Sequence, residues 1–323
     1  MNRYIGVDLG GTNLRAAIVD VETGHICHER KRPTLASDGP EAVIQRIIQL
    51  LRELLDADDA PLDAIKGVGI GVAGTPDIDT GVIQILPNLP GQWSKIPLQS
   101  IIEEQLRLPV ALINDVRAMT LGEWKFGAGR GVDTLICLAI GTGIGGGVVV
   151  NGQFHLGIGG TAGEFGHQVV ELDGLPCGCG GRGCLELYAS GSAMTAMGVK
   201  EVIHGHTTRI GELVDYDLNR INAEIIVQAA LEGDPIAGGI MERVGRYLGI
   251  AVGNILGVIS PQRVIFGGGA SRAGNLLLNP IIQTVKERVH VVPVNKVEFV
   301  FAELGNHGGV IGAALWAKQR CEE

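Results

Sequence analysis

Residues 4–19 read YIGVDLGGTNLRAAIV, two apolar runs joined by a glycine turn. Runs of this length predict strands over 4–9 and 14–19. The turn consists of Gly10, Gly11, Thr12 and Asn13. Because glycine has no side chain, backbone N–H groups of such a turn can approach a polyphosphate, and Asp8 at the strand end is placed to hold Mg²⁺. A plain β-hairpin uses the same residues, so this stretch alone leaves both interpretations open.

The same pattern recurs in the middle of the chain, where apolar runs over 132–140 and 147–151 flank a second glycine-rich turn. Its candidate ligand-binding residues are Gly141, Thr142 and Gly143. The recurrence predicts an internal duplication into two related sheet domains that hold a ligand's phosphates from both sides. A third glycine run follows an expected strand over 262–266, and it consists of Gly267, Gly268 and Gly269. This run suits the flat adenosine of a nucleotide, or a helix start packed tightly on the sheet.

Strand and helix patterns alternate along the chain, which is typical of an α/β fold. Apolar residues at 3–4 spacing predict a helix over 40–56, and the segment 186–259 is mainly helical with breaks near 205 and 233–235. Further strands are expected over 66–73, 109–113 and 296–301, and further helices over 97–107, 116–126 and 308–319.

Composition excludes several classes of protein. A chain of 323 residues with 46% hydrophobic residues fits two ordinary domains. A net charge of −9 and only 4% aromatic residues argue against a nucleic-acid partner. The apolar runs are shorter than the roughly 20 residues of a membrane helix, so no membrane partner is expected. The N-terminus carries no signal-peptide pattern, so we expect a cytoplasmic protein with reduced cysteines.

Asn114-Asp115 follows an expected strand and precedes an expected helix. A carboxylate at such a junction can accept the proton of a substrate hydroxyl that attacks a phosphoryl group. The commonest use of these residue types at a helix start is an N-cap, and the dipeptide alone favours that interpretation.

Four residues have the spacing of a metal site: His167, Cys177, Cys179 and Cys184. One imidazole and three thiolates satisfy the tetrahedral preference of Zn²⁺, and a closed set of four ligands indicates a structural ion rather than a reactive one. Incidental buried cysteines are the alternative. Glu164 and Glu186 flank this segment and are placed to hydrogen-bond a neutral polyol, or are ordinary surface carboxylates.

With these residues assembled, the chain resembles the ROK family of repressors, open reading frames and sugar kinases, and within it the bacterial glucokinases. The resemblance covers nearly the whole sequence. Its most specific part is the pair of motifs AGEFGH at 162–167 and CGCGGRGCLE at 177–186. Supporting motifs are DLGGTN at 8–13, the stretch 71–79, PNLPG at 87–91 with Trp93, Asn114-Asp115 with LGE at 121–123, GTGIGGG at 141–147 and the glycines at 267–269.

The resemblance implies an actin-like, hexokinase-type (ribonuclease H-like) duplicated α/β fold with two lobes around a cleft. The small lobe is expected over 1–115, with a C-terminal helix over about 306–323 packed back on it, and the large lobe with the zinc site over 116–305. The implied activity is an ATP-dependent glucokinase with Asp115 as general base. The three glycine turns and Asp8 would bind Mg²⁺·ATP. The apolar helices expected in the second lobe indicate a homodimer or higher homo-oligomer. The sugar hydroxyls would be contacted by Asn88, Asn114, Asp115, Glu164, His167 and Glu186.

Two departures from the family pattern concern the sugar side: Gln92 stands between Gly91 and Trp93, and Val116-Arg117 follows Asp115 where an alanine-rich stretch is usual. Another hexose (mannose, fructose, allose or an N-acetylhexosamine) and polyphosphate as donor stay open. Sugar-responsive repressors of the family carry a helix-turn-helix ahead of the first strand. That strand is expected to start by residue 4 here, which leaves no room for one, so a repressor is disfavoured. A non-catalytic nucleotide switch is disfavoured by the zinc motif.

Overall fold

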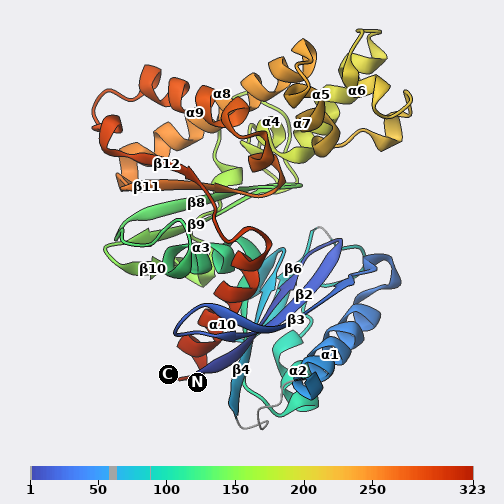
Figure 1. Cartoon of the computed structure of the whole chain (residues 1–323), viewed down its shortest axis with the longest axis vertical. Helices are drawn as coiled ribbons and strands as arrows, with labels where there is room; N and C mark the ends of the chain where they lie inside the picture. The colour runs from blue at the N-terminus through green and yellow to red at the C-terminus, as the bar shows by residue number, and fades with distance from the viewer. Residues whose placement is uncertain (1, 58–63, 88, 323) are drawn as a thin grey trace. The chain divides into compact units, whose positions relative to one another are not determined.

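The computed structural model describes residues 2–57, 64–87 and 89–322. The chain forms two compact units (Figure 1). Unit 1 consists of residues 1–131, 154–162 and 303–323, and unit 2 of residues 132–153 and 163–302. Each unit contains one five-stranded sheet and its own helices, except that the last two residues of β10 (Gln153–His155), an edge strand of the second sheet, fall in the segment 154–162 of unit 1.

The sheet of unit 1 has the strand order β3-β2-β1-β4-β7. The strands are β1 (Arg3–Leu9), β2 (Asn13–Asp20), β3 (His25–Pro33), β4 (Ile65–Val72) and β7 (Val110–Asn114). β2 runs antiparallel to β1 and β3, whereas β4 runs parallel to β1 and β7. A separate two-stranded sheet pairs β5 (Thr75–Asp77) with β6 (Val82–Ile85).

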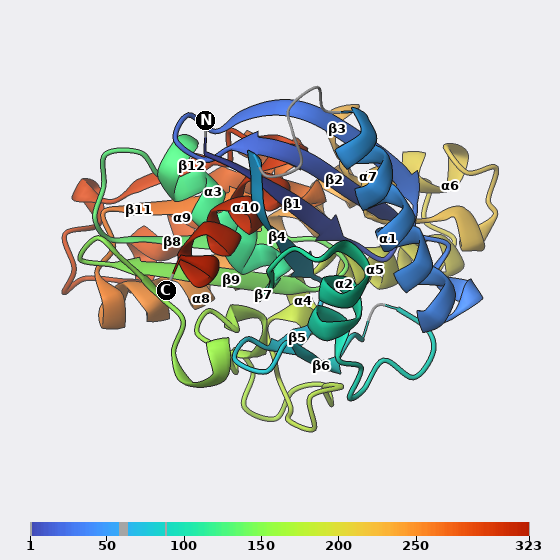
Figure 2. The same ribbon diagram turned by 90° about the horizontal axis from the view of Figure 1, so that it is seen from below.

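Two pairs of helices cover the two faces of this sheet (Figure 2). They are α1 (Pro40–Ala57) with α2 (Leu98–Leu106), and α3 (Asp115–Phe126) with α10 (Gly308–Cys321). Side chains alternate between the faces of a strand. In β1, Ile5 and Val7 join the core of α1 and α2, whereas Tyr4 joins the core of α3 and α10. Asp8 has the parity of Tyr4 and therefore lies on the α3/α10 face.

Glycines let α10 lie close to its neighbours. A Cβ on Gly6 of β1 would stand 1.7 Å from the carbonyl oxygen of Val310, and one on Gly69 of β4 would stand 1.8 Å from that of Ala313. On the helix itself, a Cβ on Gly312 would stand 1.6 Å from the carbonyl oxygen of Ala118 in α3. Backbone therefore meets backbone where α10, the sheet and α3 cross.

The sheet of unit 2 has the order β10-β9-β8-β11-β12. Its strands are β8 (Leu135–Ile140), β9 (Ile144–Val150), β10 (Gln153–His155), β11 (Arg263–Gly267) and β12 (Glu298–Phe301). The helices of this unit are α4 (Glu186–Ala189), α5 (Gly191–Ile203), α6 (Arg209–Glu212), α7 (Ala223–Leu231), α8 (Pro235–Ile259) and α9 (Asn275–Arg288). α8 packs on α9 and on α7, and its buried side chains share one core with those of β8 and β11 (Figure 1).

Among the described residues there are also short 3₁₀ segments: η1 (Ala36–Asp38), η3 (Ile158–Gly160), η4 (Phe165–His167), η5 (Leu218–Arg220), η6 (Gly269–Ala273), η7 (Val294–Lys296) and η8 (Gly305–His307).

The two sheets repeat one topology. In each, an antiparallel hairpin (β1–β2, β8–β9) is followed by strands parallel to its first member (β4 and β7, β11 and β12). The predicted α/β class and internal duplication are therefore confirmed, and the repeated mixed sheets are those of the actin-like fold. The second hairpin differs in one detail: β9 begins at Ile144 rather than at 147, because Ile144 pairs with Ile140 directly across the turn.

Candidate active site and metal centre

Asn114, and not Asp115, caps helix α3. Its Oδ1 accepts hydrogen bonds from the backbone N–H groups of Val116 (3.0 Å) and Arg117 (3.1 Å), and its Nδ2 donates to the carbonyl oxygen of Gly74 (3.0 Å). Asp115 is the first residue of the helix, and its Oδ1 accepts one bond from the next N–H, that of Val116, at 2.9 Å. The cap interpretation is thus correct for Asn114, and the Asp115 carboxylate keeps a second oxygen for other chemistry.

Asp8 and Asp115 form a pair of carboxylates within unit 1. Burial raises the pKa of Asp115 to about 7, with the charge of Asp8 adding to the rise and Arg117 opposing it. Burial also raises the pKa of Asp8 to about 6, while the guanidinium of Arg15 opposes that rise. Two buried carboxylates with raised pKa values, one of which adds to the shift of the other, suit a hard cation with oxygen ligands, or a proton acceptor poised near neutral pH.

Glycines also leave room around this pair. A Cβ on Gly71 of β4 would stand 3.4 Å from the Asp115 Cα, and one on Gly309 of α10 would stand 3.3 Å from the Asp8 Cγ. A side chain at position 309 would therefore press on the Asp8 carboxylate.

Thr34 donates hydrogen bonds to two backbone carbonyls of the first glycine turn. The Gly10 N–H bonds the Asn13 carbonyl at 3.0 Å, which closes the predicted hairpin. The Thr34 hydroxyl donates to the Gly10 carbonyl (2.7 Å), and the Thr34 N–H donates to the Thr12 carbonyl (2.9 Å). In a trans peptide the N–H points opposite to the C=O, so the amides of Gly11 and Asn13 face away from Thr34. This is the arrangement that an anion-binding turn requires.

The second glycine turn is held in the same manner by the start of α5. Its Gly141 N–H bonds the Gly143 carbonyl at 3.0 Å. The Gly141 carbonyl accepts from the N–H of Gly191 (2.7 Å), and the Thr142 carbonyl accepts from the hydroxyl of Ser192 (2.9 Å). The sequence did not indicate Thr34, Gly191 or Ser192 as parts of a site, because their partners are backbone atoms of distant segments.

The third glycine run serves the packing of unit 2. β11 ends at Gly267, and Gly268 has a φ of 83°. A Cβ on Gly268 would stand 2.4 Å from the Ile140 carbonyl oxygen, so only glycine fits against β8. The short helix η6 then begins at Gly269. The tight helix start is confirmed, and Gly268 and Gly269 are also exposed.

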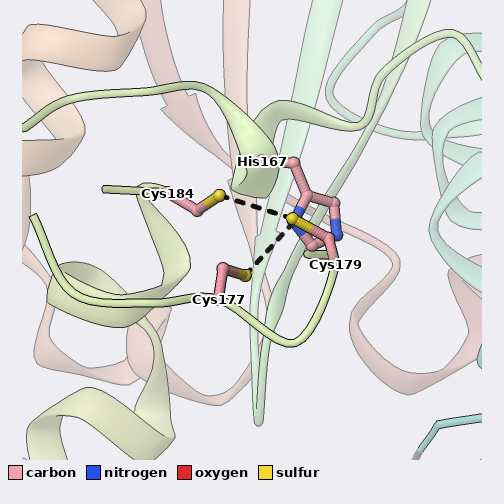
Figure 3. Close-up of side chains that lie close together, drawn as sticks. All are labelled: His167, Cys177, Cys179 and Cys184. Atoms are coloured by element: carbon pink, nitrogen blue, oxygen red, sulfur yellow. Dashed lines mark hydrogen bonds between the residues drawn. The ribbon is translucent and has the colours of Figure 1, made fainter. Parts of the chain in front are cut away.

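The four predicted metal ligands come together in unit 2 (Figure 3). Their ligand atoms all lie within 4.8 Å of one another, with 3.7 Å between the sulfurs of Cys179 and Cys184, and 3.8 Å from the Cys177 sulfur to the His167 Nδ1. A tetrahedron around Zn²⁺ with Zn–S bonds of about 2.3 Å has edges of about 3.8 Å. The donor set and its spacing therefore fit zinc. The other ring nitrogen of His167 points away from the sulfurs (Figure 3).

Glu186 connects this cluster to the second glycine turn. One of its carboxylate oxygens lies 3.3 Å from the Cys177 sulfur and 3.6 Å from the His167 Nδ1. The other lies where a Cβ on Gly143 would be only 3.0 Å away. Glu164 is exposed and immediately precedes η4, which carries His167. Of the other expected sugar-binding residues, Asn114 and Asp115 lie in unit 1, and Asn88 lies outside the described residues.

The profile of the ROK family matches residues 4–320. The chain is 38% identical to a glucokinase of Thermotoga maritima over 98% of each chain. It is 30% identical to a xylose repressor of Bacillus subtilis, over 95% of this chain and 75% of the repressor. Among solved structures it is similar to a ROK family glucokinase from Streptomyces griseus in complex with glucose and AMPPNP. That similarity has a TM-score of 0.86 and 34% identity, over 98% and 99% of the two chains.

The chain belongs to the ROK family, and its full-length similarity to glucokinases identifies it as a sugar kinase of that family. In the part of the chain that the structure describes, no helix is both long enough and apolar enough to cross a lipid bilayer.

Proposed function

We propose that this protein transfers the γ-phosphoryl group of ATP to the 6-hydroxyl of glucose, with Asp115 as the general base. The observation that carries the proposal is the state of Asp115. Because Asn114 caps the helix, Asp115 is not needed as the cap, and the pKa of Asp115 is raised to about 7. A base in this range accepts a proton near neutral pH without binding it permanently.

In the proposed step, Asp115 accepts the hydroxyl proton of the sugar as the oxygen bonds to the γ-phosphorus. The bond from that phosphorus to the bridging oxygen breaks, and ADP leaves with the electron pair. The turns at 10–13 and 141–143 supply backbone N–H groups for phosphate oxygens, with their carbonyls held by Thr34, Gly191 and Ser192. Asp8 would hold Mg²⁺, which when bound supplies positive charge for the phosphoryl oxygens.

The sugar is bound, in this proposal, by Asn88, Asn114, Asp115, Glu164, His167 and Glu186. His167 directs Nδ1 to the cysteine sulfurs and so leaves its second ring nitrogen for a sugar hydroxyl. The zinc ion held by His167 and the three cysteines would supply a fixed imidazole tautomer and a rigid loop. Glu186 touches both the cluster and the second turn, so it is placed to align the sugar with the phosphate. ATP lies against the turns at 141–143 and 267–269.

The relatives support glucose as the acceptor and ATP as the donor. Curated proteins similar to this chain over their full length include several glucokinases, and the Streptomyces griseus enzyme was solved with glucose and an ATP analogue. An N-acetyl-D-glucosamine kinase from Yersinia pseudotuberculosis is 31% identical over 97% of this chain, so the acceptor has to be measured. A cytoplasmic homodimer completes the proposal. None of the six cysteines, all of which are among the described residues, forms a disulfide bond, as a reducing compartment allows, and the helices of unit 2 expose apolar side chains such as Val258.

A panel of hexoses with ATP, followed by ADP release, tests the function directly. We expect the highest kcat/KM with glucose and no turnover without sugar. Asp115→Asn should lower kcat by at least about 10³-fold while glucose binding, measured by calorimetry, stays within a few-fold. Asp56→Asn, at an exposed carboxylate of α1, is the matched control and should behave as wild type. Near-normal turnover by Asp115→Asn would exclude Asp115 as the base, and ATP consumption independent of sugar would exclude the kinase.

A further inference from the structure

Arg117 is a buried cation two residues after the proposed base. Its exposed fraction is 3%, and it lies in the first turn of α3. Both features are unfavourable by themselves, because burial of a charge costs free energy and the N-terminal end of a helix repels positive charge. A guanidinium is retained in such a place only when specific partners hold it.

One partner is the backbone at Ala162. The Arg117 Nε–H donates to the Ala162 carbonyl oxygen at 2.9 Å. The N–H of Ala162 in turn donates to the Leu156 carbonyl at 2.8 Å. Both peptide groups of Ala162 are therefore fixed within unit 1.

Ala162 lies at the point where the chain passes from unit 1 to unit 2. It is the last residue of unit 1 before the chain enters unit 2 at Gly163, and Glu164 and His167 follow within five residues. Gly163 has a φ of 97°, and a Cβ there would stand 2.5 Å from the Gly146 carbonyl oxygen. The backbone that leads to Glu164 is thus fixed by Arg117 on one side and by packing against β9 on the other.

Arg117 also acts on Asp115 electrostatically. Among the described residues, the charges that act on this carboxylate are Asp8 of β1, which raises its pKa, and Arg117 of its own helix, which lowers it. Asp8 itself faces Arg15 of β2. The other elements packed on the start of α3 carry their charges far from Asp115. Lys66 is the second residue of β4, β7 contains no charged residue, and Lys318 and Arg320 lie near the C-terminal end of α10.

We propose that Arg117 is a positioning residue of the kinase, which ties the backbone ahead of Glu164 to the helix that carries Asp115. The inference rests on the proposed function and deepens it: a buried cation connects the segment ahead of Glu164 to the helix of the proposed base. A purely structural Arg117 would affect thermal stability but neither the KM for glucose nor the pH dependence of turnover.

Two variants separate the contact from the charge. Arg117→Lys keeps a positive charge but lacks the guanidinium Nε–H, so the KM and the Kd for glucose should rise about tenfold while the acidic limb of the kcat–pH profile stays in place. Arg117→Met removes both, so the KM should rise and the acidic limb should also move to higher pH, by about one unit, because the opposing charge is lost. The KM for ATP should change less than twofold in Arg117→Lys.

Arg130→Lys is the matched control, since the Arg130 Nε–H also donates to a backbone carbonyl, that of Gly127 at 3.1 Å, within the same unit. It should leave the KM for glucose unchanged. Because Arg117→Met can fail to fold, the test of the inference is the calorimetric glucose affinity of Arg117→Lys. A Kd within twofold of wild type overturns the inference. Wild-type protein is assayed in parallel, so absence of glucose-dependent turnover there refutes the proposed function, whereas active wild type with an unaffected Arg117→Lys refutes only the role of Arg117.

Discussion

Replacing Gly312 by Ala tests whether the contact between α10 and α3 holds the base in place. The added Cβ would stand 1.6 Å from the Ala118 carbonyl oxygen, whereas real Cβ atoms come no closer than 3.0 Å, so the two backbones must separate by about 1.4 Å. Overpacking of this kind costs about 1–3 kcal/mol, and a backbone obstacle favours the upper end. At roughly 2–4 °C per kcal/mol, the melting temperature should fall by about 6–12 °C.

The same displacement reaches Asp115, which lies three residues before Ala118 on α3. We therefore expect Gly312→Ala to lower kcat as well, because small misplacements of a catalytic group are costly. Scanning calorimetry measures the fall in melting temperature. The ADP-release assay measures kcat at a temperature where the variant is folded. Gly239→Ala is the control, since this glycine lies inside α8 with open space at its Cβ, and alanine there should stabilise the helix by about 1 kcal/mol. A Gly312→Ala protein as stable and active as wild type would refute the packing argument.

Two further predictions concern the metal and the pH dependence. Elemental analysis should find one zinc per chain. Cys179→Ser should lower the zinc content and the stability and raise the KM for glucose, whereas Cys27→Ser, outside the cluster, should change none of the three. A zinc-free preparation with normal kinetics would contradict this. Turnover should increase as the pH rises through about 7, because Asp115 must be deprotonated. The same raised pKa means that the folded state binds the Asp115 proton more tightly than the unfolded state, in which the pKa is near 3.8. The stability that this protonated carboxyl contributes is therefore lost as pH rises from about 4 to about 7. Asp115→Asn should therefore melt above wild type at pH 8 and close to it at pH 4, and an equal difference at both values would contradict the pKa shift.

Much of the fold follows from apolar runs, because a strand buried on both faces has to be apolar along its length. β1, β4, β8 and β11 are of this type and lie where they were predicted. β3 reads HICHERKRP and was not predicted, since it is an edge strand paired only with β2 and largely polar on both faces. α9 was also missed because it contains Pro280, which the structure accommodates against Gly245 of α8.

The site divides in a similar way. Residues whose chemistry depends on their own type, such as the cysteine cluster and the glycine turns, were predictable. The residues that orient them were not: Thr34, Ser192 and Arg117 act on backbone carbonyls of segments far away in the sequence, and a carbonyl has no residue type. The assignment of the cap to Asn114 rather than Asp115 likewise depends on which side chain turns toward the helix, and the dipeptide alone does not show this.

Residues 303–323 belong to unit 1, yet they are translated only after the whole of unit 2. Until they are translated, the part of the first sheet around Gly6 and Gly69 is uncovered on one face, since α10 is the helix that lies on these glycines. Most of unit 2 has by then been synthesised. The later half of the protein can thus mature before the earlier half, and a nascent chain that stalls near residue 300 would present an open β-sheet surface to chaperones.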